Sequence, residues 1–411
     1  MHNILNINTS IMGGAARIAL ALNQELNNTT GFSGRLFYGR GNEFNNNYLY
    51  RFSLAPEIIF HALITRLTGI EGKGTLFSTK RLIKYIEKNK IDLVHLHNIH
   101  GYYLDFLLFT DYLKRKSIPV VWTLHDCWSF TGSCAYLFDC KKYLTGCGRC
   151  PNIKTYPRNY SDNSAHMWRV KKRIFSEGWQ PVIVTPSKWL ADIAKTSYLG
   201  EHRIEVIPNG IDVDIFRPYD KESARLELGI PADGRVILFI AADLNDERKG
   251  VKYFLEAVQK ISDTDNLVIV TAGQKIKEGL PIKVNMHEFG FLSDKNILAR
   301  LYSAADVFCI TSLDEIFGLT VTEAMACGKP VVGFKVGGIP EQVAGDCGIL
   351  VAPKDVSALA GALQSIIGDG KQKSVYADNC RKRVLDNYTA ELMVKRYVKL
   401  YTDMLTTNKH S

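Results

Sequence analysis

Residues Thr311–Val332 read TSLDEIFGLTVTEAMACGKPVV. Within this stretch the apolar run Leu319–Ala326 predicts a short helix, Gly328 is placed as its C-terminal stop, and Pro330 follows as a breaker. An apolar run before it, Val307–Ile310, and the pair of valines that closes it predict strands. A strand, a helix and a second strand in this order favour a parallel sheet.

Two carboxylates frame the start of this helix. Glu315 and Glu323 stand eight residues apart, with the turn Phe317-Gly318-Leu319-Thr320 between them. A helix that begins at a glycine offers free backbone N–H groups and the positive end of its dipole, which together suit a phosphate. Glu323 can accept hydrogen bonds from sugar hydroxyls, and Glu315 can face a second part of the same ligand. The stretch therefore predicts a site for a nucleoside diphosphate that carries a sugar. A solvated charge on an amphipathic helix is the simpler alternative for Glu323.

The same alternation of short strands and amphipathic helices runs through the chain and predicts an α/β protein with parallel sheets. Its 411 residues suit two domains. The turn formers at Pro208–Asp212 place the join, giving domains of residues 1–212 and 213–389 and a last helix over 390–408. The predicted strands are Ile4–Asn8, Asp92–His97, Val120–Leu124, Val182–Thr185, Ile204–Ile207, Val236–Ala241, Leu267–Thr271, Val284–Glu288, Val307–Ile310, Val331–Phe334 and Gly348–Val351.

Composition narrows the class of protein. Apolar residues make up 46% of the chain and charged residues 23%, as in soluble globular proteins. We find no run of about 18 uncharged apolar residues, so no transmembrane helix is expected. The N-terminus, MHNILNINTSIMGG, reads as a first strand rather than a signal peptide. These features predict a cytoplasmic protein.

The Glu315-to-Glu323 pattern resembles the E-x7-E signature of retaining glycosyltransferases, in particular glycosyltransferase family 4, and the resemblance covers nearly the whole chain. It implies the GT-B architecture, in which two Rossmann-like domains with parallel sheets face each other across a cleft. The N-terminal domain would bind the acceptor and the C-terminal domain the nucleotide-sugar donor. The last helix would pack back on the first domain. HDCWSFTGSCAY, followed by TGCGRCP, resembles bacterial members that build colanic acid and capsules.

Several residues at predicted strand ends match the family in the first domain. Gly13-Gly14 opens a helix after the first strand and resembles the glycines that face the donor phosphates and the acceptor. His125 ends the strand in VVWTLHD and matches a histidine that contacts the transferred sugar. A packed structural histidine is the alternative. We expect His97, one strand away, to line the acceptor site.

In the second domain, Arg248-Lys249 stands between a strand and a helix, where two cations can neutralise the leaving diphosphate. Lys249 matches the family's lysine. The usual arginine position falls near Asp243, a departure that Arg248 would compensate. Gly273 and Leu292 match places where family members hold the nucleotide base.

Cysteines cluster after His125. Cys134, Cys140, Cys147 and Cys150 read C-x5-C-x6-C-x2-C. A C-x2-C pair suits a tetrahedral structural zinc ion, and free thiols or disulfides are the alternatives.

Together these features predict a retaining, metal-independent glycosyltransferase that moves a sugar from a UDP- or GDP-sugar to a surface polysaccharide or lipid-linked oligosaccharide, with no cofactor in catalysis. Three alternatives stay open: a sugar-nucleotide 2-epimerase, a phosphorylase, and a non-enzymatic binder of nucleic acid or membranes. The first would need acid/base carboxylates, and the second a pyridoxal lysine or a second phosphate site. Only the pI of 8.9 suggests nucleic acid, so no such partner is expected.

Positive charge is concentrated in the first half. Residues 1–212 hold 26 Lys and Arg against 16 Asp and Glu, whereas the remainder holds 25 against 26. The stretch Pro56–Thr68 has an apolar face beside basic residues, so it is either a core helix or a segment that lies on an anionic membrane. Peripheral association with the inner face of the plasma membrane is therefore one expectation.

Overall fold

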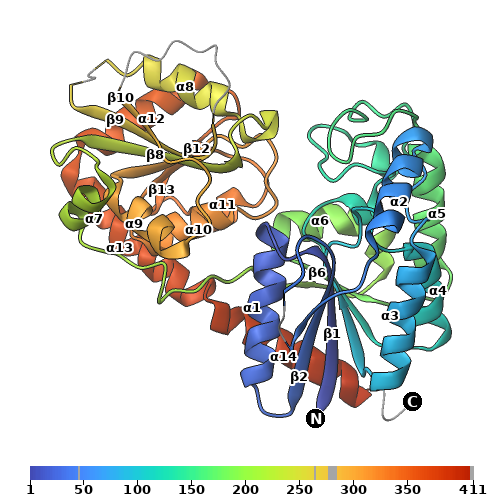
Figure 1. The fold of residues 1–411 in the computed structure, drawn as a ribbon. Coiled ribbons are helices and arrows are strands. Elements are labelled where there is room, and N and C mark those ends of the chain that lie inside the picture. Colours follow the sequence, from blue (N-terminus) through green and yellow to red (C-terminus); the bar gives the residue numbers. More distant parts are fainter. Residues whose placement is uncertain (45–46, 263–264, 276–284, 408–411) are drawn as a thin grey trace. The chain divides into compact units, whose positions relative to one another are not determined.

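The computed structural model describes residues 1–44, 47–262, 265–275 and 285–407 (Figure 1). The chain divides into two compact units. Unit 1 comprises Met1–Pro208 and Met393–Ser411, and unit 2 comprises Asn209–Leu392. Two residues of predicted elements, Val284 and residue 408, lie outside the described part of the chain.

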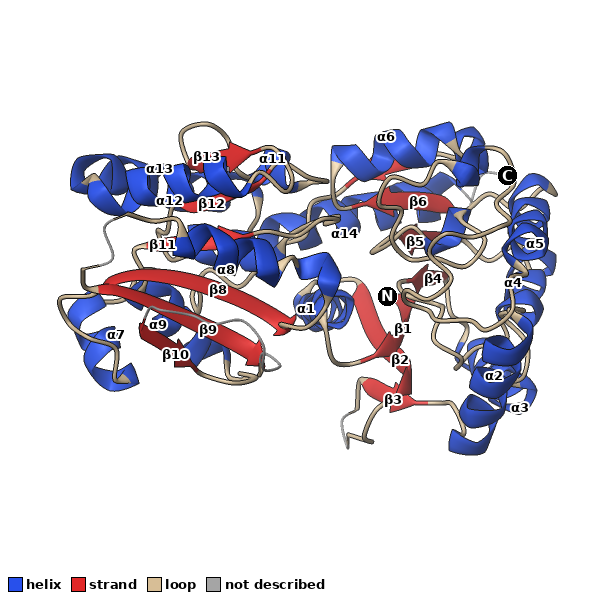
Figure 2. Ribbon diagram, turned by 90° about the horizontal axis from the view of Figure 1, so that it is seen from above, coloured by secondary structure: helices blue, strands red, loops and turns tan. Residues whose placement is uncertain are grey.

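Unit 1 contains a seven-stranded sheet of order β3-β2-β1-β4-β5-β6-β7, in which every described neighbour pair is parallel. These strands lie side by side in Figure 2. Their bounds are β1 (His2–Ser10), β2 (Phe32–Arg40), β3 (Leu49–Arg51), β4 (Leu93–Leu96), β5 (Val120–Thr123), β6 (Val182–Thr185) and β7 (Ile204–Val206).

Helices connect most of these strands, except β2 and β3, which a loop joins, and the last helix returns to the unit at the end of the chain. They are α1 (Gly14–Asn28), α2 (Ala55–Thr68), α3 (Leu76–Asn89), α4 (Phe106–Arg115), α5 (Ser164–Ser176), α6 (Lys188–Thr196) and α14 (Ala390–Thr407), with 3₁₀ turns η1 (Trp128–Phe130), η2 (Lys142–Leu144) and η3 (Tyr198–Glu201). Among the described residues, no helix is long and apolar enough to cross a membrane.

Unit 2 contains a six-stranded parallel sheet of order β10-β9-β8-β11-β12-β13. Its strands are β8 (Arg235–Asp243), β9 (Leu267–Gln274), β10 (Asn285–Glu288), β11 (Val307–Ile310), β12 (Val331–Phe334) and β13 (Gly348–Val351). Its helices are α7 (Lys221–Leu228), α8 (Val251–Gln259), α9 (Lys295–Ala304), α10 (Leu319–Ala326), α11 (Ile339–Gln342), α12 (Val356–Gly368) and α13 (Gly370–Asn387), with the 3₁₀ turn η4 (Glu247–Lys249).

The core of unit 2 has two halves, one on each face of the sheet. Alternate residues of a strand point to opposite faces. Leu238 and Phe308 therefore pack with residues of α7, α9, α10 and α13, whereas Ile237 and Val307 pack with α8 and α12 (Figure 1). Burial on both faces explains why the strands are continuous apolar runs.

The last helix, α14, packs on the sheet of unit 1 (Figure 1). Its Tyr401 hydroxyl lies 2.6 Å from Nδ1 of His95 on β4. Its Tyr397 hydroxyl lies 2.8 Å from the Thr123 hydroxyl on β5, which is also 2.8 Å from Nε2 of His95. His95 is therefore a buried structural residue.

The predicted fold class of two Rossmann-like parallel-sheet units is confirmed, and the strands predicted within the described residues are present. Strands β2 and β3 and helices α7 and α13 were not predicted from the sequence. Strand β2, FSGRLFYGR, lies next to the edge of the sheet and mixes glycines, serine and arginines with its apolar residues, so its apolar pattern is weak. Helix α13 is mostly polar and buries only Cys380 and Val384, so its apolar periodicity is weak.

Candidate functional site

Two loops at the carboxyl end of the unit 2 sheet are tied together. The N–H of Leu313 donates to the Arg248 carbonyl at 2.7 Å, and the Thr311 hydroxyl donates to the Gly250 carbonyl at 2.8 Å. Gly250 has a φ of 65°, and a Cβ there would lie 2.1 Å from the Thr311 carbonyl oxygen. Only glycine permits this approach, which fixes η4 against the segment after β11.

Lys249 and Glu315 meet in this corner. Lys249 Nζ donates to Glu315 Oε2 at 2.6 Å, and the Ser312 hydroxyl donates to the same oxygen at 3.2 Å. Arg248 Nη1 lies 3.6 Å from it. Burial alone would raise the pKa of Glu315, but Lys249 and Arg248 outweigh this effect and lower it below the usual value. The predicted catalytic residues of unit 2 are thus assembled as a charged cluster.

Arg248 is held in place by further contacts. Its guanidinium donates to the Asp314 carbonyl at 3.1 Å and to Asp246 Oδ2 at 3.2 Å. Its side chain is 12% exposed. The guanidinium therefore lies beside Lys249 and Glu315, although its donors are partly occupied by the protein.

The glycine turn begins helix α10 as predicted, with Gly318 as its N-cap. The Gly318 N–H donates to Gln342 Oε1 at 3.1 Å, and its contact with a phosphate stays a prediction. Gln342 Nε2 donates in turn to the Gly318 carbonyl at 3.0 Å. Within the described residues, the N–H groups of Leu319 and Thr320 are the ones in this first turn for which no protein acceptor is seen.

Glu323 and Phe317 are buried. Glu323 is 1% exposed, and its Oε2 accepts a hydrogen bond from the Tyr302 hydroxyl at 2.9 Å. Tyr302 is a partner that the sequence did not reveal. Phe317 packs edge-on against Tyr388, with ring centroids 5.7 Å apart, so its side chain belongs to the core. The solvated-charge interpretation of Glu323 is therefore wrong, and its contact with a ribose stays a prediction.

The residues predicted to hold the base lie at the end of β9 and after β10. Gly273 has a φ of 147°, and its N–H donates to the Gly290 carbonyl at 2.8 Å. A Cβ on Gly273 would lie 1.9 Å from the Ala241 carbonyl oxygen. Leu292 is partly buried against the core. Gly273 thus serves close packing at the strand end, and base binding stays a prediction.

In unit 1, His97 and His125 follow β4 and β5 and form a pair. Nδ1 of His97 lies 3.0 Å from Nε2 of His125, and the two rings stack with centroids 5.3 Å apart. Burial lowers the pKa of His125 to about 4 and that of His97 well below its usual value, so both rings are neutral at pH 7. Both line the same small cavity.

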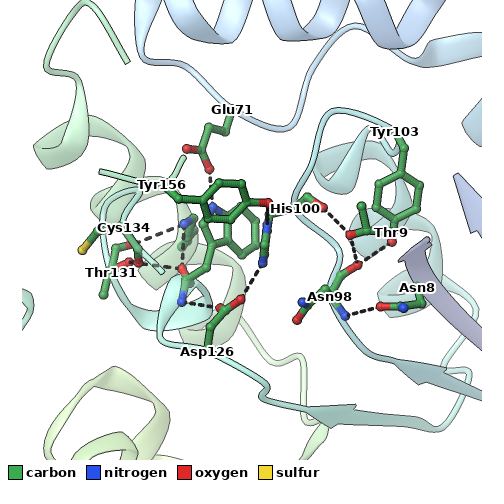
Figure 3. Close-up of polar contacts among 12 residues, drawn as sticks. Asn8, Thr9, Glu71, Asn98, His100, Tyr103, Asp126, Thr131, Cys134 and Tyr156 are labelled. Atoms are coloured by element: carbon green, nitrogen blue, oxygen red, sulfur yellow. Dashed lines mark hydrogen bonds and ion pairs between the residues drawn. The ribbon is translucent and has the colours of Figure 1, made fainter. Parts of the chain in front are cut away.

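His100 and Asp126 form a second polar group in the same cavity, which was not predicted from the sequence. His100 Nε2 lies 2.6 Å from Asp126 Oδ2, and its Nδ1 lies 3.3 Å from the Tyr156 hydroxyl (Figure 3). Asp126 Oδ1 accepts a hydrogen bond from the Trp128 N–H at 2.9 Å. Burial would raise the pKa of Asp126, but His100 and this N–H lower it below the usual value. The sequence feature that could have indicated this group is Asp126, the acidic residue directly after His125.

Beside them, Trp128 is held between two buried charged residues. Its indole N–H donates to Glu71, and Lys171 Nζ lies 3.5 Å from its ring centroid and donates to its carbonyl at 2.8 Å. Burial raises the pKa of Glu71 and lowers that of Lys171 to about 8. Glu71 and His100 also line a second small cavity. No sequence motif indicates these contacts, because the residues lie far apart in the chain.

Gly13 and Gly14 lie where β1 ends and α1 begins. Gly13 is the N-cap of α1 with a φ of 94°. The end of β1 is fixed by Thr9, whose hydroxyl donates to the carbonyls of Asn98 and His100 (Figure 3). The two glycines and the histidine loop therefore belong to the same edge of the unit 1 sheet.

The four predicted zinc ligands line one small cavity in unit 1. Burial raises the pKa of Cys134 to about 12 and that of Cys147 to about 11. Among the described residues, no group of three or more His, Cys, Asp or Glu side chains is already arranged to hold a metal ion. Cys134, Cys140, Cys147 and Cys150 are thus neighbours, and their metal binding stays a prediction.

Comparison with known proteins identifies the class. The family "Glycosyltransferase Family 4" matches residues 12–215, and "Glycosyl transferases group 1" matches residues 220–383. WcaC of Escherichia coli K12, provisionally assigned as a colanic acid biosynthesis glycosyl transferase, is 26% identical over 98% of this chain and 100% of its own. An uncharacterized glycosyltransferase of Methanocaldococcus jannaschii, MJ1607, is 30% identical over 63% of this chain and 67% of its own.

A solved structure, Anabaena HepE in complex with UDP and glucose, covers 98% of this chain with a TM-score of 0.70 and 18% identity, over 100% of its own length. This likeness and the two parallel-sheet units show the GT-B fold. With the family matches over both units, the chain belongs to the family 4, group 1 glycosyltransferases.

Proposed function

We propose that the protein is a retaining glycosyltransferase that uses a nucleoside-diphosphate sugar as donor. The observation that supports this most is the cluster of Lys249, Arg248 and Glu315 at the start of α10. It joins two cations, a carboxylate and a helix N-terminus, which is the set of groups that a diphosphate and a sugar need. The related fold of HepE, in complex with UDP and glucose, supports a uridine donor.

The proposed chemistry is loss of a diphosphate leaving group. As the sugar–phosphate bond breaks, negative charge grows on the phosphate oxygens, and Lys249 and Arg248 stabilise it together with the N–H groups of Leu319 and Thr320. Glu315 Oε2 accepts a hydrogen bond from Lys249 Nζ at 2.6 Å. Donor phosphates would share Lys249 with it, leaving the carboxylate to orient sugar hydroxyls. Glu323 would bind the ribose. In this account cationic side chains do the work of a metal ion.

Retention of configuration is proposed through a front-side, internal-return-like route. A double displacement needs a carboxylate free to attack the sugar. Asp126 lies in the histidine cavity, but its two oxygens accept from Trp128 and contact His100. Because both oxygens already have partners, Asp126 is disfavoured as the nucleophile.

The acceptor is proposed to bind unit 1, with a hydroxyl near the neutral histidines. His97 has a buried Nε2 that lacks a hydrogen-bond partner within the described residues, and His125 is partly exposed. The partly exposed ring of His125 suits a sugar hydroxyl, and the buried His97 supports that ring from behind. The likeness to WcaC favours a growing surface polysaccharide or a lipid-linked oligosaccharide as acceptor, used on the cytoplasmic side of the membrane.

Helix α2 offers a surface for an anionic membrane. Ile59, Phe60, Leu63 and Leu67 share one face and are each more than half exposed, with Ile59 at 69%. This exposure argues against the core-helix alternative. Exposed Arg66, Lys73, Lys80, Arg81 and Lys84 lie on or after this helix and complement anionic head groups.

Liposome flotation tests this surface. We expect the protein to float with anionic but not with neutral vesicles at low salt, and Phe60→Ser with Leu63→Ser to abolish flotation. Leu226→Ser, at a residue of unit 2 that is 85% exposed, is the control and should float normally. Absence of flotation by the unaltered protein, or flotation unchanged in the α2 variant, contradicts the proposal.

A donor screen tests the enzymatic function. UDP-, GDP- and ADP-sugars are compared by thermal shift, and those that stabilise the protein are incubated with acceptor extracts. We expect one nucleotide class to stabilise the fold and its sugar mass to appear on an acceptor, with the donor's anomeric configuration by NMR. An isomerised sugar nucleotide from donor alone would instead identify an epimerase, and an inverted product would contradict retention.

A further inference from the structure

The segment between β5 and α5, residues 124–163, is packed without regular structure. It contains two 3₁₀ turns and no described α-helix or strand, yet Trp128, Phe130 and Leu137 within it are buried. A long loop of this kind has few backbone ladders to hold it, so other cross-links are needed to keep one conformation. The four clustered cysteines belong to this segment.

The cysteines come together from distant points of the loop. Cys134, Cys140, Cys147 and Cys150 all line one small cavity, and Thr131 lines it too. All four are free thiols. Four sulfur atoms around one cavity match the ligand number and type of a closed structural zinc site.

The backbone around the C-x2-C pair is turned tightly. Gly146, Cys147, Gly148 and Arg149 all have positive φ, at 126°, 56°, 89° and 47°. For Cys147 and Arg149 this conformation is unfavourable by about 1–2 kcal/mol each. Something in the native state must therefore offset it, and coordination of both cysteines to one ion would do so.

Donors that suit thiolates surround the cavity. The Gly132 N–H donates to Cys147 Sγ at 3.3 Å. The buried Lys171 ammonium interacts electrostatically with Cys134 and Cys147. Hydrogen bonds and positive charge around ligating sulfur atoms are the usual second layer of a metal–thiolate site.

We propose that Cys134, Cys140, Cys147 and Cys150 bind one structural zinc ion that fixes the 124–163 loop. Each thiol releases its proton to solvent on binding, and the Zn²⁺ ion takes four thiolates with no change of oxidation state. As they stand, the described side chains form no group that holds a metal ion, so zinc binding requires the four thiols to rotate toward a common centre. The site is separate from the donor cluster of unit 2.

Metal analysis tests the site directly. Protein produced in zinc-supplemented medium and purified without chelators should contain about one zinc per chain by mass spectrometry. The double variant Cys147→Ser, Cys150→Ser should retain less than a tenth of it. Cys127→Ala, a buried cysteine of the same loop outside the cavity lining, is the matched control and should keep its zinc. Zinc below a tenth per chain in the unaltered protein, or full zinc in the double variant, overturns the proposal.

A second measurement needs no folded variant. A mercurial reagent titrated into the unaltered protein should release one zinc, detected with a colorimetric dye, as four thiols react. Alkylation of the denatured, chelated and unreduced protein should modify all nine cysteines. Two disulfides would leave four unmodified and overturn the proposal in favour of oxidative cross-links. Failure of either measurement leaves donor binding by unit 2 untouched, so the two proposals fail separately.

Discussion

The candidate site of unit 2 consists of charged side chains that pair with one another. The cavity of unit 1 is instead lined mainly by histidines that burial keeps neutral. Lys249 and Glu315 lie 2.6 Å apart on neighbouring loops, and the nearby cations lower the pKa of the carboxyl group. His97 and His125 lie 3.0 Å apart, and burial lowers the pKa of both. Because of this difference, we expect the two units to respond differently to removal of a charged side chain, to acid and to substitution of a glycine.

The largest expected effect is on unit 2. Lys249→Ala should lower kcat for sugar transfer by about a hundredfold to a thousandfold, because loss of one preorganised group facing the developing charge costs about 2.7–4 kcal/mol. Glu315→Ala should lower transfer at least tenfold. Steady-state kinetics with the preferred donor measures both.

Lys252→Ala is the matched control, since Lys252 is an exposed lysine on the adjoining helix α8. It should retain the unaltered rate. Normal rates for Lys249→Ala and Glu315→Ala in folded protein would remove the charged cluster from the mechanism.

Acid should affect unit 1 first. The pKa of His125 is lowered to about 4, so the unfolded chain binds a proton below pH 6.5 that the folded chain does not bind until about pH 4. Stability is therefore present above pH 6.5 and falls by on the order of 3 kcal/mol toward pH 4. In unit 2, the pKa of Asp306 is lowered to about 2, so its contribution is lost only below about pH 4.

Hydrogen exchange at pH 7 and pH 5, corrected for intrinsic rates, should show peptides of β4 and β5 losing protection before those of β8 and β11. Equal loss in both units would contradict the contrast between neutral and charged sites.

Substitutions at two glycines test how much the close contact between Gly250 and Thr311 in unit 2 contributes to stability. Gly250→Ala should destabilise the protein by about 2 kcal/mol or more, since a left-handed φ costs about 1–2 kcal/mol and the new Cβ meets the Thr311 carbonyl at 2.1 Å. Gly229→Ala has nearly the same φ, 66°, with no atom within 4 Å. It should cost only about 1 kcal/mol. Urea unfolding measures both, and equal losses would show that the close approach is unimportant.

The last comparison, whose lower value is the smallest expected loss, uses two buried tyrosines. Tyr302→Phe removes the donor to the Glu323 carboxylate and should cost about 1.5–3 kcal/mol. Tyr401→Phe removes the contact with neutral His95 and should cost about 0.5–1.5 kcal/mol. Chemical unfolding of the two variants gives the difference, and a larger loss for Tyr401→Phe would reverse the expected order.

Much of unit 2 could be predicted because its site is local in sequence. The Glu315 loop, the Gly318 cap and the helix that follows lie within one short stretch, and Lys249 precedes a helix after a strand. Even there, the partner of the Gly318 N–H could not be foreseen, because Gln342 comes from a separate helix.

Unit 1 was harder to predict because its contacts join distant segments. His100 and Asp126 meet only when β4 and β5 lie side by side, and Glu71 reaches Trp128 from the segment between α2 and α3. Periodicity locates the strands but does not say which side chains face one another across them. Strands β2 and β3, at or next to the sheet edge, and the polar helices α7 and α13 were not predicted for the same reason. Their formation depends on packing rather than on a local sequence pattern.

Calorimetric titration of nucleotides tests the central claim most directly. Of UDP, GDP and ADP, at least one should bind the full chain ten or more times more tightly than its monophosphate, because the second phosphate meets Lys249 and the start of α10. Lys249→Ala should remove that preference and leave monophosphate binding unchanged. If no diphosphate binds more tightly than its monophosphate, or if Lys249→Ala keeps the preference, the donor site assigned to unit 2 is wrong.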